Sequence, residues 1–277
     1  MKGKSKIQLA LWALLFMVAI PISAYGVDGQ IKIAQTVETT FPITINEPGS
    51  YVLTSNLIVT TGNAININAD NVTLDLNGHG IYGPGTGNGI NARNQFNITI
   101  KNGIVRGFYY GIALFNDADN KGAGHRIEGI QASNNGGNGI YAYYSTVTNC
   151  TANNNGSHGI SAPYSTVTNC TASNNTSCGI YARYSTVTNC TANDNGSCGI
   201  YAWYSTVTNC TANDNSTDGI YAYKSTVKGC NVRDNTGYGI NMSPGFHNYI
   251  YRNAASGNTA GQIYCPSGNT CVDNATF

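Results

Sequence analysis

The nonapeptide YSTVTNCTA occupies residues 144–152 and recurs unchanged at 164–172, 184–192 and 204–212. Around it, consecutive 20-residue blocks align without a gap, and they begin at Tyr141, Ser161, Tyr181, Tyr201 and Tyr221. A period this short indicates that each block is one turn of a solenoid, because a single turn cannot bury its own apolar side and must stack on its neighbours. The sequence therefore predicts one elongated repeat domain.

The spacing of apolar residues within a block predicts β coils. In the block 139–158 the apolar positions are Ile140, Ala142, Val147, Cys150 and Ala152. Their spacings suit short strands separated by bends and do not fit the 3.6-residue period of a helix. The abundant Thr, Val, Ile, Tyr, Asn and Gly favour strands and tight turns. Stacked β coils rise by about 4.8 Å, so equivalent residues should form straight columns.

Several motifs resemble a known family. EPGSYVLTSNLIV (47–59), VTLDLNGHGIYG (72–83) and the later Val-x-x-Cys-x-Ala-x-x-Asn with Gly-Ile are similar to the right-handed parallel β-helix proteins of the pectate-lyase-like superfamily, the pectin lyase fold. The resemblance implies an all-β, single-stranded solenoid. Its repeats occur in polysaccharide lyases, glycosidases, epimerases, accessory proteins of copper enzymes and surface proteins without known activity, so the resemblance specifies fold better than function.

The chain divides into four predicted segments. A β-helix of roughly ten coils spans 51–255, with regular 20-residue repeats over 121–240, between an N-terminal cap at 27–50 and a C-terminal cap at 256–277. Residues 1–26 read as a secretory signal peptide, with a basic start, a short apolar run and small residues before the cleavage site. The apolar run is too short for a membrane anchor. We expect a monomer outside the cytoplasm, secreted or periplasmic.

The charge balance argues against nucleic acid as a partner. The full chain has 14 basic and 13 acidic residues, and removal of the signal peptide with its three lysines leaves a slightly acidic protein. Phosphate backbones are bound by clustered Lys and Arg. Here the charges are few and scattered, so nucleic acid and anionic membranes are excluded as expected partners.

The cysteines fall into separate groups. One column points inward, and the matching Ile130 in an earlier coil indicates that this position needs a buried apolar side chain; its members are Cys150, Cys170, Cys190, Cys210 and Cys230. We interpret them as small buried hydrophobes, with a metal–thiolate chain as the alternative. Cys265 and Cys271 bracket a Pro/Gly loop after the last coil of an exported protein, which predicts a disulfide.

A second column offers metal-ligand chemistry. His158, Cys178, Cys198 and Asp218 occupy one position in four successive coils. Nitrogen and sulfur ligands on adjacent coils could hold a soft transition metal such as zinc or copper. A disulfide between Cys178 and Cys198, or two free thiols, are the alternatives.

The turns carry asparagine and aspartate in columns. The first column predicts an amide ladder along the stack and contains Asn155, Asn175, Asn195, Asn215 and Asn235. The adjacent column contains Asp194, Asp214 and Asp234, which could bind calcium or sit at glycosidase spacing. Asparagine replaces aspartate elsewhere in that column, which favours a turn role. No cofactor is predicted, and calcium or a soft metal remain the alternatives.

Outward aromatic columns predict a carbohydrate-binding face. Aromatic rings can contact sugar faces, and large exposed aromatic patches usually signify contact, although rings in a column can also simply stack on one another. The candidate residues are Tyr141, Tyr143, Tyr181, Arg183, Tyr201, Trp203, Tyr221 and Tyr223. Tyr144, Tyr164, Tyr184 and Tyr204 lie near the following bend.

The sequence contains no convincing catalytic set. Gly78-His79-Gly80 matches a polygalacturonase-like motif only superficially, and the best enzyme case would rest on irregular coils around Asp75, Arg93, Arg106, Asp117 and Asp119. We therefore predict a non-catalytic carbohydrate-binding or structural protein of the cell envelope or matrix. A polysaccharide lyase or glycoside hydrolase is the alternative. Paired threonines such as Thr146 and Thr148 add an ice-binding solenoid as a further possibility.

Overall fold

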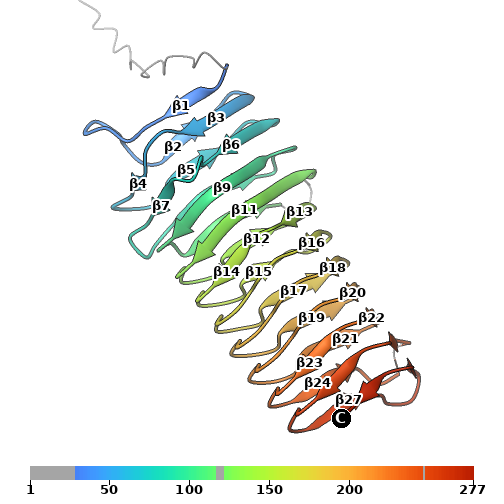
Figure 1. The fold of residues 1–277 in the computed structure, drawn as a ribbon. Helices are drawn as coiled ribbons and strands as arrows, with labels where there is room; N and C mark the ends of the chain where they lie inside the picture. Colours follow the sequence, from blue (N-terminus) through green and yellow to red (C-terminus); the bar gives the residue numbers. More distant parts are fainter. Residues whose placement is uncertain (1–28, 117–121, 246) are drawn as a thin grey trace, which may run out of the picture.

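The computed structural model describes residues 29–116, 122–245 and 247–277. The predicted signal peptide at 1–26 and the acidic residues Asp117 and Asp119 lie outside these ranges. The described chain winds into an elongated stack of coils that are joined side by side by parallel strands (Figure 1). Within these ranges every regular element is a strand, and no helix has the length and apolar character needed to cross a membrane.

Two long sheets run the length of the stack. The first sheet has 15 strands: β1 (Ile31–Ile33), β3 (Gly49–Leu53), β4 (Leu57–Ile58), β6 (Val72–Asp75), β7 (Gly80–Tyr82), β9 (Thr99–Arg106), β11 (His125–Ser133), β13 (Ser145–Thr148), β14 (Thr151–Asn153), β16 (Thr166–Thr168), β18 (Thr186–Thr188), β20 (Thr206–Thr208), β22 (Thr226–Lys228), β25 (Tyr249–Tyr251) and β28 (Thr270–Val272). The second sheet has 11 strands: β2 (Ile43–Ile45), β5 (Ile65–Ile67), β8 (Asn88–Arg93), β10 (Tyr110–Phe115), β12 (Ile140–Ala142), β15 (Ile160–Ser161), β17 (Ile180–Arg183), β19 (Ile200–Trp203), β21 (Ile220–Tyr223), β24 (Tyr238–Met242) and β27 (Gly261–Tyr264). A shorter third sheet contains β23 (Asn231–Arg233), β26 (Ala254–Ser256) and β29 (Ala275–Thr276).

The predicted fold and repeat are confirmed. In the regular repeats, strands one coil apart pair in parallel at a shift of 20 residues, as in Ile180 with Ile200 and Val187 with Val207. The second sheet contributes one strand per coil, which gives 11 coils in the described chain, close to the roughly ten predicted. Strands β1 and β2, inside the segment predicted as a cap, already pair with β3 and β5.

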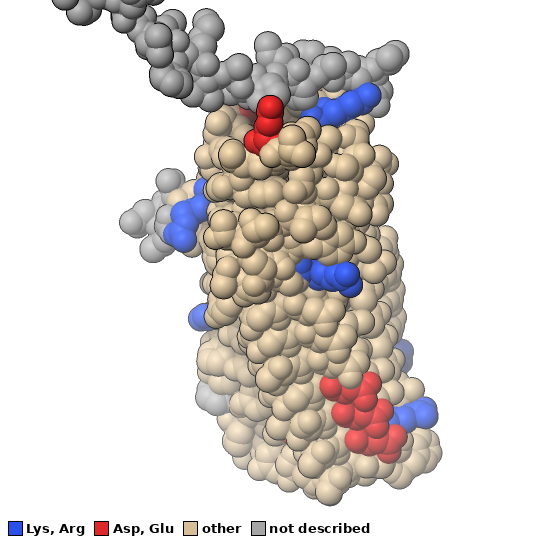
Figure 2. Space-filling view, turned by 90° about the vertical axis from the view of Figure 1, so that its left-hand side faces the viewer, with Lys and Arg blue, Asp and Glu red and all other residues tan. Residues whose placement is uncertain are grey.

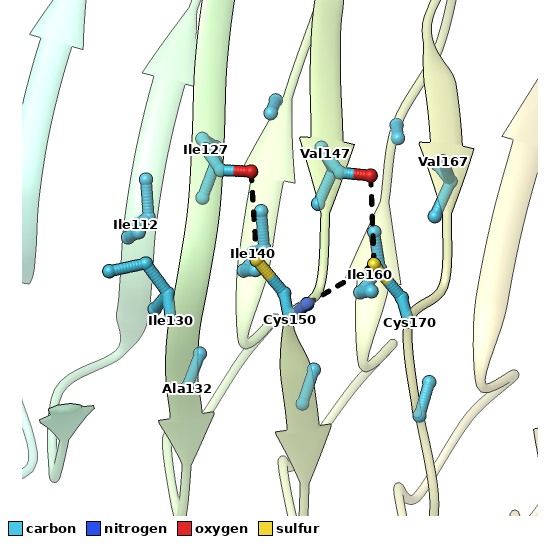
Figure 3. Close-up of a cluster of buried hydrophobic side chains, with 14 of the residues drawn as sticks. Ile112, Ile127, Ile130, Ala132, Ile140, Val147, Cys150, Ile160, Val167 and Cys170 are labelled. Carbon is cyan, nitrogen blue, oxygen red and sulfur yellow. Dashed lines mark hydrogen bonds between the residues drawn. The ribbon is translucent and has the colours of Figure 1, made fainter. Parts of the chain in front are cut away.

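The core is a set of inward columns. Ile127 and Val147 follow one another in the first sheet, and Ile140 and Ile160 do so in the second (Figure 3). All are fully buried, and burial of each such side chain contributes about 1.5–3 kcal/mol. Cys150 lies in the column of Ile130, and its side chain is 1% exposed. The five cysteines of this column are free and buried, which confirms their predicted place in the core.

Each regular coil turns at three corners of the same construction. In the coil that contains β13 and β14 the corner residues Tyr144, Asn149 and Asn154 have positive φ angles of 47°, 54° and 56°. After each comes a buried residue whose N–H points along the stack, out of reach of its own coil. A side chain of the next coil accepts that N–H at every corner. The acceptors are Ser165 Oγ at 2.9 Å, Cys170 Sγ at 3.5 Å and Asn175 Oδ1 at 3.0 Å.

The three acceptor columns continue into the irregular coils with other residues. At the first corner His125 pairs in register with Ser145, and its Nδ1 accepts the Ile98 N–H at 3.3 Å. At the other end of the same column, Asn248 Oδ1 accepts the N–H of Ser225 at 2.8 Å. The asparagine column bonds amide to amide as well, which confirms the predicted ladder. An acceptor of suitable reach is the common requirement.

We predict that Asn175→Ala destabilises the protein by about 2–4 kcal/mol. Asn175 accepts the Asn155 N–H and donates to the carbonyl of Ala152 at 2.9 Å, so its loss leaves buried polar groups without partners. Urea unfolding monitored by circular dichroism measures the change. The matched control is Thr176→Ala, at an exposed neighbour, which should stay within about 0.5 kcal/mol. Equal midpoints for the two variants would contradict a structural ladder.

We also predict that stability falls as pH drops from about 6.5 towards 4. Burial lowers the pKa of His125 to about 4, and the nearby Asp70 opposes this shift. Between these pH values the unfolded chain binds a proton that the native state does not, so acid favours unfolding by on the order of 2 kcal/mol at pH 5. His125→Asn, which copies Asn248, should remove this part of the pH dependence. The measurement is the urea unfolding midpoint of both proteins at pH 7 and pH 5. If the variant loses as much stability between these pH values as the unmodified protein, the role of His125 is refuted.

Candidate functional site

The second sheet displays the predicted aromatic residues on its outer surface. Along β19 the side chains alternate, with Ile200 and Ala202 buried and Tyr201 and Trp203 half-buried on the outside. Register pairing places Tyr181, Tyr201 and Tyr221 in one straight column. Their rings stack with centroids 5.0 and 5.2 Å apart. Burial raises the pKa of Tyr201 to about 12, so its hydroxyl stays protonated and uncharged at neutral pH.

A second outer column lies beside the first. Trp203 contacts Tyr223 with ring centroids 4.4 Å apart, and the Arg183 guanidinium lies 5.6 Å from the Trp203 ring. In an earlier coil, the hydroxyl of Tyr141 donates to that of Tyr143 at 3.1 Å. We call these two columns the aromatic wall, which contains Tyr141, Tyr143, Tyr181, Arg183, Tyr201, Trp203, Tyr221 and Tyr223. The structure brings all the predicted carbohydrate-binding residues together on one face.

The wall is interrupted at one coil, and His158 fills the gap. Ser161 occupies the tyrosine position there and is buried. The His158 ring packs against Tyr181 with centroids 5.1 Å apart. Burial lowers the pKa of His158, which keeps the ring neutral. A neutral imidazole ring therefore lies beside Tyr181 at the coil where the tyrosine column is interrupted.

The predicted metal site is not formed. Cys178 and Cys198, on adjacent coils, are joined by a disulfide, so neither sulfur is a thiolate ligand. Asp218 accepts hydrogen bonds from the Tyr238 N–H and the Asn241 side chain, both at 2.8 Å. Within the described part of the chain no group of three His, Cys, Asp or Glu side chains is arranged to hold a metal ion. Because equivalent positions lie only one coil apart, a bond between the two sulfurs replaces convergence on a metal.

The disulfide predicted for the C-terminal loop is present. Cys265 and Cys271 are bonded across the loop that joins β27 to β28 in the last coil. Cys271 is also partly buried against the core. The bond therefore closes the loop between two strands of the terminal coil.

The carboxylates proposed for calcium take corner positions. Asp194, Asp214 and Asp234 all have positive φ angles near 55° and are exposed. The same corner carries Asn154 and Asn174 in earlier coils, with equivalent φ angles, so the shared property is tolerance of the left-handed region. Figure 2 shows acidic side chains gathered in one small area of an otherwise sparsely charged face.

The irregular N-terminal coils hold their charged residues in local contacts. Asp75 forms an ion pair with Lys101 at 3.2 Å and accepts the Asn77 N–H at 2.8 Å. Arg106 lies over the Tyr82 ring at 4.8 Å. Arg93 lies over Phe115 at 5.5 Å. These are contacts of the residues named for the enzyme alternative that lie within the described ranges.

The structure adds a column that the predicted site omitted. Tyr144, Tyr164, Tyr184 and Tyr204 lie at the corner between the two long sheets, and we call this column the corner ladder. Consecutive rings are nearly parallel, with centroids 4.9, 5.0 and 4.9 Å apart. All four have positive φ, an uncommon conformation for a bulky residue. The tyrosine that opens every copy of YSTVTNCTA could have identified this column. It was missed because the residue lies at a corner, where the inward–outward alternation of a strand does not predict the direction of the side chain.

The ring stacking determines what these tyrosines present to solvent. Each ring covers the face of the next coil's ring, so the faces point along the stack and the edges point outward. At the end of the ladder, Lys224 donates to the Tyr204 hydroxyl at 3.0 Å. The ladder therefore exposes phenol edges and hydroxyls at a repeat of one coil, and sugar rings cannot stack on its covered faces.

A groove runs along the corner ladder, on the side of the first sheet. Its volume is about 640 Å³, and it crosses four successive coils at the start of β11, β13, β16 and β18. We call it the hydroxyl groove, since most of its lining residues carry hydroxyls. They are Gly124, His125, Arg126, Tyr144, Ser145, Thr146, Tyr164, Ser165, Thr166, Tyr184, Ser185 and Thr186.

Comparisons with known proteins agree with this architecture. No curated protein matches the chain in sequence. Among solved structures, the A-modules of the Azotobacter vinelandii mannuronan C-5 epimerases AlgE4 and AlgE6 superpose with TM-scores of 0.72 and 0.69 at 15% identity. Both superpositions cover 90% of this chain, and they cover 84% and 89% of the respective modules. The Agl-KA catalytic domain is more distant, with a TM-score of 0.54 at 15% identity over 90% of this chain and 60% of the domain.

The similarity to these solved structures shows a common fold. Sequence adds the family: residues 43–206 and 182–277 match the family described as right handed beta helix region. These matches together span the second sheet from its first strand to its last. The chain therefore belongs to the right-handed β-helix family.

Proposed function

We propose that this chain is an exported, non-catalytic glycan-binding protein that acts through its lateral surface. In this proposal residues 1–26 are removed as a signal peptide, and the mature monomer works outside the cytoplasm. The observation that carries the proposal is the continuous surface formed by the aromatic wall, the corner ladder and the hydroxyl groove. A polymer with repeated chemistry suits a protein whose side chains repeat at a fixed distance.

The wall and the ladder offer the chemistry that glycans require. Tyrosine presents an apolar ring edge beside a hydroxyl that donates and accepts hydrogen bonds. Exposed aromatic residues in a contiguous patch usually mark a contact site. The similar folds include modules named for mannuronan, which is a polysaccharide, and this supports a glycan as the class of partner.

The groove chemistry supports binding without catalysis. General acid–base catalysis needs titratable groups that can reach the reacting atoms. His125 is buried, with its Nδ1 occupied by the Ile98 N–H. Arg126 is paired with Glu128 at 2.9 Å. A lyase or hydrolase remains the alternative that the experiment below separates.

The test is affinity electrophoresis of the mature protein through gels containing neutral or uronate polysaccharides. We expect retardation by at least one polymer without a cleared zone after staining for the polymer. The variants Trp203→Ala and Tyr184→Ala should each weaken retardation by about tenfold in apparent Kd, since central contact residues contribute more than 1 kcal/mol.

Thr176→Ala, on a different corner, is the matched control and should migrate like the unmodified protein. Cleared zones would establish the enzyme alternative instead. Free migration in every gel would remove glycan binding as the function.

A further inference from the structure

The hydroxyl groove contains two kinds of hydroxyl: some are already hydrogen-bonded within the protein, and others can bond to a ligand. The serines at its floor are saturated: Ser165 Oγ accepts the Ser145 N–H at 2.9 Å and donates to the Pro163 carbonyl at 2.8 Å. Ser185 repeats the arrangement, with its Oγ 2.8 Å from the Arg183 carbonyl. The floor therefore belongs to the corner construction and has little capacity left for a ligand.

Two rows of hydroxyls stand on either side of this floor. One row is formed by the corner ladder and the other by the first residue of the outward threonine pair in each coil. The hydroxyls belong to Tyr144, Tyr164 and Tyr184 on one side and to Thr146, Thr166 and Thr186 on the other. Within the described chain these hydroxyls make no hydrogen bond to protein atoms. Each can donate and accept. A ligand in the groove would thus meet paired hydroxyls at three of its four coils.

The charged residues near the groove are placed at its ends or outside it. Arg126, at one end, is neutralised by Glu128. Lys224 bonds to Tyr204 beyond the other end, and Arg183 lies over the Tyr184 ring on the side of the aromatic wall. Neither Lys224 nor Arg183 lines the groove. Between the ends, an anionic sugar would find hydroxyl donors and no lining cation to pair with, whereas a neutral sugar needs only the hydroxyls.

We infer that the hydroxyl groove binds a neutral polysaccharide chain that lies along the solenoid axis. This inference rests on the proposed glycan-binding function and specifies its ligand class. Three coil rises of about 4.8 Å give a groove roughly 14 Å long, enough for about three sugar rings. Sugar hydroxyls would bond to the threonine row on one side and to the phenol row on the other, with one set of contacts per coil.

The test compares neutral and uronate chains on variants that remove single hydroxyls. The probes are soluble glucan, mannan, xylan and galactan, with mannuronan and polygalacturonate as the anionic set. Tyr164→Phe keeps the stacked ring and loses its hydroxyl, and Thr166→Val keeps the branched shape. Each should weaken binding of the neutral polymer about three- to tenfold, as expected for one hydrogen bond, and the double variant should weaken it further.

Thr168→Val is the matched control, because Thr168 lies on the same strand, outside the groove, and should leave binding unchanged. Isothermal titration calorimetry at 20 and 200 mM salt gives the second readout, with no salt dependence expected for a neutral chain. Binding of uronates alone, or neutral binding insensitive to both groove variants, would overturn this inference and leave glycan binding intact. Failure of all six polymers would overturn both.

Discussion

The corner hydrogen bond between a backbone N–H and a side chain of the next coil is the interaction on which this solenoid depends. A chain that turns at a left-handed residue directs the next N–H away from the strand ladder, and a buried N–H without a partner is costly. Serine, cysteine and asparagine each supply the missing acceptor at their own corner. The same construction limits neighbouring space. A Cβ at Gly179 would lie 2.7 Å from both the Asn195 amide and the Ala172 carbonyl, which accounts for glycine there.

This construction places only one requirement on the outward residue of each corner. It must tolerate positive φ, and the protein places tyrosine at one corner, asparagine at the second, and asparagine or aspartate at the third. Because the choice repeats over several coils, a corner can carry a row of one residue type, as the four tyrosines do before Lys224 takes their corner. The surface chemistry can therefore vary while the core stays constant, which explains how one fold serves several functions.

Stacking changes the meaning of the aromatic residues. An isolated tyrosine on a surface offers its ring face, whereas a tyrosine in an in-register column gives that face to its neighbour and keeps its edge and hydroxyl. The corner ladder and the Tyr181–Tyr201–Tyr221 column of the aromatic wall both behave in this way. These columns therefore present hydroxyls that repeat at the coil spacing, and few open ring faces.

The sequence by itself determined the coil, the register and the inward columns, because a constant period of 20 aligns equivalent residues without knowledge of any contact. It predicted that Cys150 follows Ile130, that Asn155 begins an amide ladder, and that Tyr201 faces outward. Tertiary structure alone decided that Cys178 and Cys198 form a disulfide in place of a metal site, since this depends on the direction of both side chains. It also decided that His125 accepts a backbone N–H as the serines do, because the period places His125 beside Ser145 but does not give the direction of its ring. The division of groove hydroxyls into bonded serines and free threonines and tyrosines came from structure for the same reason: period fixes which residues are neighbours, and geometry fixes which of their atoms meet.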